Sequence, residues 1–62
     1  MNTNQNYRTA DLGDGVTLRE CIGNPVGPEK IGTTYVYLNG KYRFTCASKK
    51  EAMGMKGRAL AA

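Results

Sequence analysis

The sequence predicts a small α+β domain in which two hairpins form a four-stranded antiparallel sheet and a C-terminal helix packs on one face (ββββα). Gly13-Asp14-Gly15 and Asn39-Gly40 each lie between runs of alternating apolar and polar residues, as in β-hairpins. Ser48, with Glu51 three residues later, forms the capping box of a helix start. A chain of 62 residues has room for one two-layer domain.

The domain is expected to span residues 7–62 and to follow a polar tail, residues 1–6, that reads MNTNQN. The sequence contains no apolar run of the kind that marks a secretory signal, and no apolar segment reaches the length of a membrane span. We therefore expect a cytoplasmic protein with no membrane partner.

The first hairpin is best explained by a three-residue loop at Gly13–Gly15, with Gly15 in the left-handed position of a bulge. This register places apolar residues opposite one another and opposite charges together: Leu12 with Val16, Ala10 with Leu18 and Arg8 with Glu20. The other face then carries Thr9, Asp11, Thr17 and Arg19.

The stretch from Gly23 to Gly32 contains three glycines and two prolines, which predicts a loop. Ten residues is long for so small a domain. The loop either serves as a plain connection to the second hairpin or carries function, as long ordered loops often do.

The second hairpin turns at Asn39-Gly40, and a tight turn there fixes which residues share a face. One face pairs Tyr37 with Tyr42, Tyr35 with Phe44 and Thr33 with Cys46; the other pairs Leu38 with Lys41, Val36 with Arg43 and Thr34 with Thr45. We expect the helix to cover the aromatic face. The alternative is that these rings stack on unpaired bases.

The helix after Ser48 has an apolar arc that would cover the sheet: Ala52, Met55, Ala59 and Ala62, with Met53 and Leu60 beside them. Lys56 interrupts this arc. Gly54 and Gly57 each weaken a helix by about 1 kcal/mol relative to alanine, which predicts a short helix.

The residue types argue against catalysis and against a bound metal or cofactor. Histidine, the commonest general base and metal ligand, is absent. Cys21 and Cys46 form no metal or redox motif, and in a reducing compartment we expect two packed thiols rather than a disulfide. The sequence therefore predicts a non-enzymatic protein.

Positive charge is concentrated in the C-terminal half, since residues 33–62 hold six of the nine Lys and Arg but one of the five Asp and Glu. This asymmetry suggests an anionic partner. The face opposite the helix would present Thr and Arg for a DNA major groove, or would simply be a solvated sheet surface. The candidate nucleic-acid-binding residues are Arg43, Lys41, Thr45, Arg19, Lys49 and Lys50.

Residues 33–62, TTYVYLNGKYRFTCASKKEAMGMKGRALAA, resemble the AP2-like and arm-type DNA-binding domains of phage and transposon tyrosine recombinases. In those domains a last hairpin leads through a T/S-K-K-E-A step into a helix packed on the sheet, and SKKEA at residues 48–52 is similar. The resemblance implies a sheet that enters the major groove, with base or phosphate contacts from Arg43, Lys41 and Thr45.

Two functions follow as hypotheses. The first is a nucleic-acid-binding module, DNA more than RNA, of the kind found as an accessory factor of phages or mobile elements. The second is a phage-type inhibitor or adaptor that binds a host protein, through the loop at residues 23–32 or the Met53 and Met55 side of the helix. Either a monomer or a homodimer is compatible with the sequence.

Overall fold

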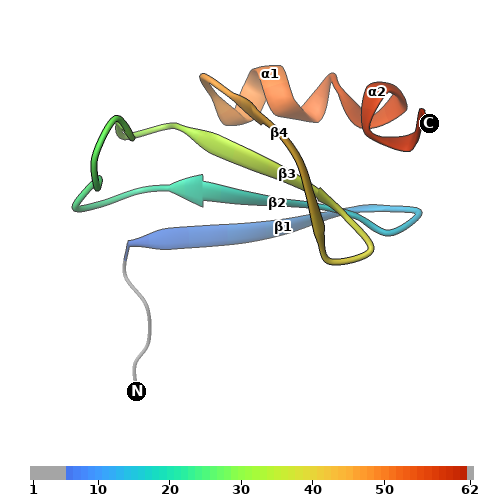
Figure 1. Ribbon diagram of the computed structural model, residues 1–62, viewed down its shortest axis with the longest axis horizontal. Coiled ribbons are helices and arrows are strands. Elements are labelled where there is room, and N and C mark those ends of the chain that lie inside the picture. Colours follow the sequence, from blue (N-terminus) through green and yellow to red (C-terminus); the bar gives the residue numbers. More distant parts are fainter. Residues whose placement is uncertain (1–5, 62) are drawn as a thin grey trace.

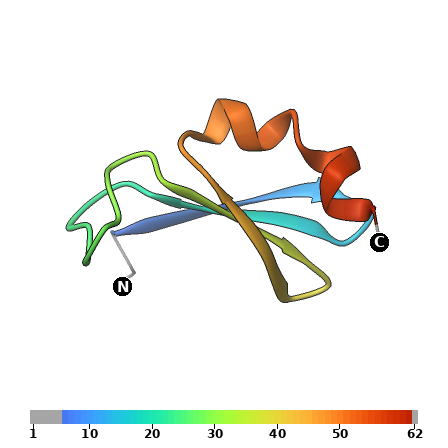
Figure 2. The ribbon, with the colours of Figure 1, turned by 45° about the horizontal axis from the view of Figure 1, so that its top comes forward.

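The computed structural model describes residues 6–61 as a four-stranded antiparallel sheet with two short helices on one side (Figures 1 and 2). The elements are β1 (Tyr7–Gly13), β2 (Val16–Cys21), β3 (Thr34–Leu38), β4 (Lys41–Cys46), α1 (Lys49–Met53) and α2 (Lys56–Leu60). The strand order is β1-β2-β3-β4, a simple meander. The predicted α+β class and the strand content are confirmed, and the single predicted helix is divided in two.

Two of the three cross-strand pairs predicted for the first hairpin are found, but the third, Leu12 with Val16, is wrong, because Gly13 pairs with Val16. Arg8 pairs with Glu20 and Ala10 with Leu18, as expected. The tight turn, however, consists of Asp14 and Gly15, with φ of 55° and 82°, and the register shifts at Leu12, the extra residue of a β1 bulge. A two-residue turn plus a bulge therefore replaces the predicted three-residue loop.

The second hairpin corrects the predicted faces. Its turn at Asn39-Gly40 is as expected, and Tyr37 still pairs with Tyr42. Beyond that pair the register shifts, so that Val36 faces Phe44, because β4 contains one extra residue, Arg43. A shift of one residue turns side chains to the opposite face. Phe44 consequently points toward the helices, whereas Tyr35 lies opposite Thr45.

The core lies between the helices and the aliphatic side chains at the centre of the sheet. Leu18 pairs with Val36 across β2 and β3, and both are fully shielded from solvent, as is Val16. Ala52 and Ala59 cover them from the helix side. The prediction that the helix packs on the tyrosine face is therefore wrong: the tyrosines of β3 lie on the other side of the sheet.

The two helices follow from specific local signals. Ser48 caps α1, because its hydroxyl oxygen accepts a hydrogen bond from the amide of Glu51 at 3.1 Å, as the capping box predicts. The helical segment breaks at Gly54, after which α2 begins. Of the predicted apolar arc, Ala52 and Ala59 are buried, Met55 packs against the core, and Ala62 lies outside the described residues.

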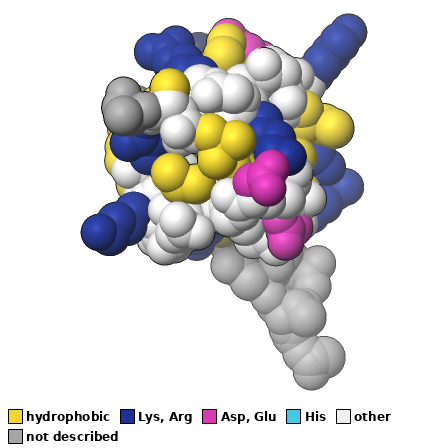
Figure 3. Space-filling view, turned by 90° about the vertical axis from the view of Figure 1, so that its right-hand side faces the viewer, with side chains coloured by type: hydrophobic (Ala, Val, Ile, Leu, Met, Phe, Trp, Pro, Cys, Tyr) yellow, Lys and Arg dark blue, Asp and Glu magenta, His cyan; other side chains and the backbone are white. Residues whose placement is uncertain are grey.

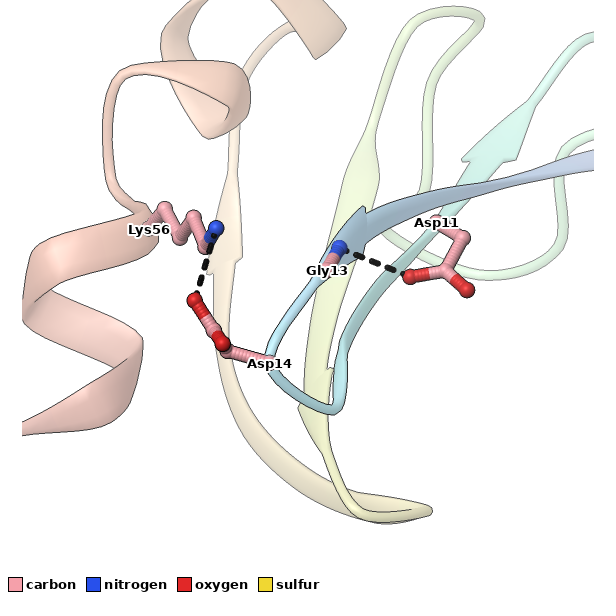
Figure 4. A network of polar contacts seen from close by, with 4 residues as sticks. All are labelled: Asp11, Gly13, Asp14 and Lys56. Carbon is pink, nitrogen blue, oxygen red and sulfur yellow. Dashed lines mark hydrogen bonds and ion pairs between the residues drawn. The ribbon is translucent and has the colours of Figure 1, made fainter.

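Lys56, expected to interrupt the apolar arc of the helix, joins α2 to the first hairpin (Figure 4). Its ammonium nitrogen lies 3.0 Å from Oδ2 of Asp14 in the β1–β2 turn. In the same turn the carboxylate of Asp11 accepts a hydrogen bond from the amide of Gly13 at 2.8 Å. An ion pair this exposed contributes little to the free energy of folding.

The core assignment can be tested with two valine substitutions that remove the same atoms. Val36→Ala should lower the free energy of unfolding by about 2 kcal/mol, because Val36 is fully buried. Val26→Ala, at a residue 70% exposed, should change it by less than about 0.5 kcal/mol. Urea unfolding followed by circular dichroism measures both. Equal effects of the two substitutions would contradict the assigned core.

Candidate functional site

The side of the sheet opposite the helices, here called the open face, is lined by polar and aromatic side chains. Strand alternation and pairing place there Tyr7, Thr9 and Asp11 of β1, Thr17, Arg19 and Cys21 of β2, Tyr35 and Tyr37 of β3, and Tyr42 and Thr45 of β4. Both helices lie on the other side (Figure 2). Antiparallel sheets can leave one such face to solvent.

Two tyrosines stand together near the β3–β4 turn. Tyr37 and Tyr42 form an edge-to-face pair with ring centroids 6.2 Å apart and an interplanar angle of 72°. Tyr42 is 58% exposed. Its hydroxyl lies 2.8 Å from Oγ1 of Thr45, which fixes the ring on the strand. Because these rings are already held in place, a flat ligand that stacks on their exposed faces would cost little conformational entropy.

Arg19 places a positive charge at the centre of the same face. Its guanidinium carbon lies 4.1 Å from the centroid of the Tyr7 ring, a cation–π contact. In register, Arg19 is opposite Tyr35, which is in turn opposite Thr45. A row of arginine, tyrosine and threonine thus crosses three strands, and Arg19 and Thr45 remain exposed.

The loop between β2 and β3 is fastened to the open face by one carboxylate, Glu29. The Tyr7 hydroxyl donates to Oε1 and Oε2 of Glu29 at 2.9 and 3.0 Å, and the Tyr35 hydroxyl donates to Oε2. The amide of Val26 donates to Oε1 at 3.1 Å. Asn6 also holds the loop, since its carbonyl accepts from the amides of residues 22 and 23. Asn6, the last residue of the tail predicted at residues 1–6, is therefore hydrogen-bonded to the loop.

These contacts shift the pKa values of the groups involved. The hydrogen bond from Tyr35, with those from the Val26 amide and Tyr7, lowers the pKa of Glu29 against the opposing effect of its burial. The same hydrogen bond raises the pKa of Tyr35 to about 12, and the one from Tyr7 raises the pKa of Tyr7. Glu29 is thus an anion and both tyrosines are neutral donors at neutral pH.

An open pocket of about 380 Å³ lies where this loop meets the end of β3 and β4. The residues lining it are Pro28, Glu29, Thr33, Tyr35, Thr45, Cys46 and Ala47. None of them is Lys or Arg, so the only formal charge in the lining is the carboxylate of Glu29. The pocket adjoins the open face through Tyr35 and Thr45.

Both thiols are free and buried, on opposite sides of the sheet. Cys46 belongs to the core under the helices. Cys21 pairs with Tyr7 on the open face beneath the loop, and its thiol donates to the carbonyl of Gly23 at 3.6 Å. Burial raises the pKa of each thiol. Their burial as thiols agrees with the sequence prediction.

The structure separates the sequence-predicted site residues. Arg19 and Thr45 lie on the open face, but Arg43 donates to the carbonyl of Ala61 at 2.6 Å, just beyond α2. Lys41 pairs with Leu38, which packs against the helix-side core. Lys49 and Lys50 begin α1, on the same side as the core. The single basic face that was expected therefore does not form.

At the end of the molecule formed by the β1–β2 turn and α2, the basic side chains are spread out rather than gathered in one patch (Figure 3). Figure 3 views the end formed by the β1–β2 turn and α2, and Lys and Arg side chains project there in several directions around its outline. Two basic residues of α2 are engaged within the fold, since the guanidinium carbon of Arg58 lies 5.1 Å from the Phe44 ring centroid and Lys56 pairs with Asp14. The distribution of basic residues therefore does not by itself identify a binding surface.

Sequence reasoning missed the two residues that organise the open face, Glu29 and Tyr7. Their contact joins residues 22 positions apart, through a loop whose composition indicates only irregular structure. Two features of the sequence could have indicated this contact. Tyr7 begins a strand on the same face as Arg19, and Glu29 is the one acidic residue in the long loop.

Residues 6–61 contain no group of three or more His, Cys, Asp or Glu side chains placed to hold a metal ion. Neither helix in the described chain has the length and apolar character needed to cross a bilayer.

No family model matches the chain, and no curated protein or solved structure matches it. The resemblance to AP2-like and arm-type domains therefore stays a prediction. The structure gives the hairpin-to-helix step at Ser48 that the resemblance implies. It places Arg43 and Lys41 away from Thr45, so the three do not line one groove-facing surface.

The Glu29 contacts predict how stability depends on pH. A carboxyl whose pKa is lower when folded stabilises the protein above its unfolded pKa, and that contribution is lost as pH falls through the folded value. Thermal unfolding midpoints should therefore decrease below about pH 4.5. Conversely, the pKa of Tyr35 is raised to about 12, so its contribution is complete below about pH 10 and is lost as pH rises through about 12.

Glu29→Gln should reduce both losses, because it removes the charge shared by the two tyrosine contacts. Glu20→Gln, which removes one carboxylate from β2, is the matched control and should leave the pH profile close to that of the unmodified protein. Circular dichroism melts across the pH range measure these midpoints. Identical profiles for the two variants would refute the role given to Glu29.

Proposed function

We propose that this protein is a non-enzymatic module that binds single-stranded nucleic acid on its open face. The observation that carries the proposal is the placement of Tyr37 and Tyr42 on the solvent side of the sheet, together with Arg19. Bases stack on exposed aromatic rings, and each stacked base is worth about 1–3 kcal/mol. Arginine beside such rings contacts the phosphates or stacks in turn.

The same geometry favours a single strand over a duplex. Reading a major groove requires donors and cations to line one ribbon, and Arg43 and Lys41 lie apart from Arg19 and Thr45. Exposed tyrosine rings find no free base to stack on in a duplex, where the bases are already stacked on one another. A strand with unpaired bases meets both the rings and the cation.

The proposal can be tested by fluorescence anisotropy with labelled single-stranded DNA, single-stranded RNA and duplex DNA of about twelve nucleotides. The double variant Tyr37→Ala/Tyr42→Ala should weaken single-strand binding by at least about 10-fold. Met53→Ala, on α1 and 53% exposed, removes a similarly exposed apolar side chain and should leave the affinity unchanged. Absence of binding at low salt, or equal losses in both variants, would exclude the open face.

A salt series separates the role of Arg19 from general charge. Affinity should decrease as salt rises from about 50 to about 200 mM, because bound cations release counterions from the strand. Arg19→Gln should weaken binding and make this salt dependence shallower. Lys50→Gln removes the same charge from the start of α1 and serves as the control. A larger effect of Lys50→Gln would favour the groove-binding arrangement expected from the sequence.

One observation favours a protein partner as a second candidate function. Val26 and Ile31, both in the loop between β2 and β3, are 70% and 61% exposed. Aliphatic side chains fixed on an ordered loop are suited to a protein surface rather than to phosphates. If oligonucleotides fail to bind, an inhibitor or adaptor that acts through this loop becomes the proposal to test.

A further inference from the structure

Four side chains form a row across the open face, one from each strand. Asp11 of β1 pairs with Thr17 of β2. Thr17 pairs with Tyr37 of β3, which in turn pairs with Tyr42 of β4. Neighbouring strands lie about 4.8 Å apart, so the backbones of Asp11 and Tyr37 are about 10 Å apart with Thr17 between them. The row therefore runs from a carboxylate, through a hydroxyl, to the pair of rings.

Arg19 lies beside the middle of this row. It follows Thr17 by two residues on β2, so it is a diagonal neighbour of both Asp11 and Tyr37. Diagonal neighbours are about 7–8 Å apart, within reach of a long side chain. Among the described residues of the open face, Arg19 is the only cation. A base stacked on Tyr37 with its phosphate at Arg19 therefore has its sugar over Thr17, next to Asp11.

Asp11 offers an acceptor that the protein itself does not use. Its side chain is exposed, and Oδ1 accepts from the amide of Gly13 at 2.8 Å. Within residues 6–61, no side chain or amide donates to Oδ2. Figure 4 shows Asp14, of the same hairpin, pointing to Lys56 of α2, whereas Asp11 points away from it. One oxygen of Asp11 thus remains for a ligand.

Glu29, by contrast, supplies no such acceptor. The Tyr7 hydroxyl and the Val26 amide donate to its Oε1, and the hydroxyls of Tyr7 and Tyr35 donate to its Oε2. The carboxylate available on the open face is therefore that of Asp11. A carboxylate there repels the phosphates of any strand, and a hydrogen bond donated by the ligand offsets that repulsion.

The 2′-hydroxyl of ribose is the donor that fits this position. It is the group by which a protein distinguishes RNA from DNA. A carboxylate only accepts, so the hydroxyl donates to it in a charge-assisted hydrogen bond. Deoxyribose has no donor at the same place, and a DNA strand would meet the negative charge of Asp11 without any compensating contact.

We propose that the open face selects single-stranded RNA over single-stranded DNA, and that Asp11 determines this preference by accepting a hydrogen bond from a ribose 2′-hydroxyl. The inference rests on the proposed function, because a base on Tyr37 and a phosphate at Arg19 place the ribose. It assigns stacking to Tyr37 and Tyr42, which accept any base, and sugar selection to Asp11. The preference is opposite to the one expected from the sequence, which favoured DNA.

The test compares labelled oligo(rU) and oligo(dU) of about twelve nucleotides by fluorescence anisotropy, since the two differ only in the 2′-hydroxyl. Oligo(rU) should bind about 10-fold more tightly, the lower end for a hydrogen bond to a charged group. A 2′-fluoro oligo(U) keeps the ribose-like sugar conformation but has no donor, so it should bind like oligo(dU). Binding of the 2′-fluoro strand as tight as that of oligo(rU) would overturn the role of Asp11.

Asp11→Asn keeps an oxygen for the Gly13 amide and replaces the other oxygen by a nitrogen that cannot accept. It should reduce the preference to less than about 3-fold, because a neutral amide bonds a hydroxyl more weakly than a carboxylate does. Asp14→Asn removes the same charge from the same hairpin, on the side of Lys56, and is the matched control that should keep the preference. A preference kept at about 10-fold in Asp11→Asn would refute the assignment.

NMR titration of the unmodified protein avoids any effect of a substitution on folding. The amide of Gly13 donates to Asp11, so a new partner on that carboxylate changes its environment. This amide should shift with oligo(rU) and stay in place with oligo(dU), whereas the amide of Tyr37 should shift with both. Equal shifts of the Gly13 amide in the two titrations would contradict the contact.

The outcomes distinguish this inference from the proposed function. Equal affinity for oligo(rU) and oligo(dU), lost in Tyr37→Ala/Tyr42→Ala, would refute sugar selection and leave single-strand binding intact. Tighter binding of oligo(dU) would refute sugar selection by Asp11 as well. If neither strand binds at low salt and no amide of the open face shifts, both proposals are wrong.

Discussion

The arrangement of the molecule depends on how closely the two short helices approach the sheet. Ala52 and Ala59 are the buried helix residues, and neither has a side chain beyond Cβ. They can cover Val16, Leu18 and Val36 at close range, but they leave no room for tyrosine rings beneath them. A tyrosine there would also need a buried partner for its hydroxyl. The aliphatic face is therefore the one that is covered, and the tyrosines remain on the open face.

A single extra residue in β4 makes this division of faces complete. Arg43 has no opposite residue in β3, and beyond it Phe44 faces Val36 on the helix side. Phe44, half-buried, then packs its ring against the core, with Arg58 5.1 Å from the ring centroid. Arg43 itself is turned to the end of α2, where it satisfies the carbonyl of Ala61. Without the bulge Arg43 would face Val36 on the helix side and Phe44 would lie on the open face; with it, Phe44 packs against the core instead.

The parts of the fold that the sequence predicted are those set by local chemistry. Gly15 and Asn39-Gly40 adopt positive φ where tight turns need it, and Ser48 caps a helix where a capping box stands. The register of Ala10 with Leu18 was also predicted, because cross-strand pairs of similar character are favoured. Turns, caps and adjacent pairs each depend on a few neighbouring residues.

The faces of the second hairpin were not predicted, because a bulge such as that at Arg43 needs no glycine and leaves no mark in the sequence. Because the extra residue in β4 was not anticipated, every residue of β4 after Arg43 was paired with the wrong face of β3. The better indicator was β3 itself, where Val36 and Leu38 alternate with two tyrosines. Aliphatic residues match Leu18 and Val16 in the neighbouring strand, and that match is found in the structure. The candidate site moved with the faces: Arg19 and Thr45 stayed on the open side, and Arg43 and Lys41 left it.

The carboxylate of Glu29 has two roles in the structure. It fastens the loop by accepting hydrogen bonds from β1 and β3, through Tyr7 and Tyr35, and it lines the pocket that the fastened loop creates. A neutral Glu29 would weaken both contacts and would also lose the charge that repels phosphate from the pocket. The pocket therefore keeps its shape and its negative charge only while Glu29 is ionised and the loop is held. A protein of this size has few side chains available for separate roles, and in the described chain the residue that anchors the longest loop is also the only charged residue lining the pocket.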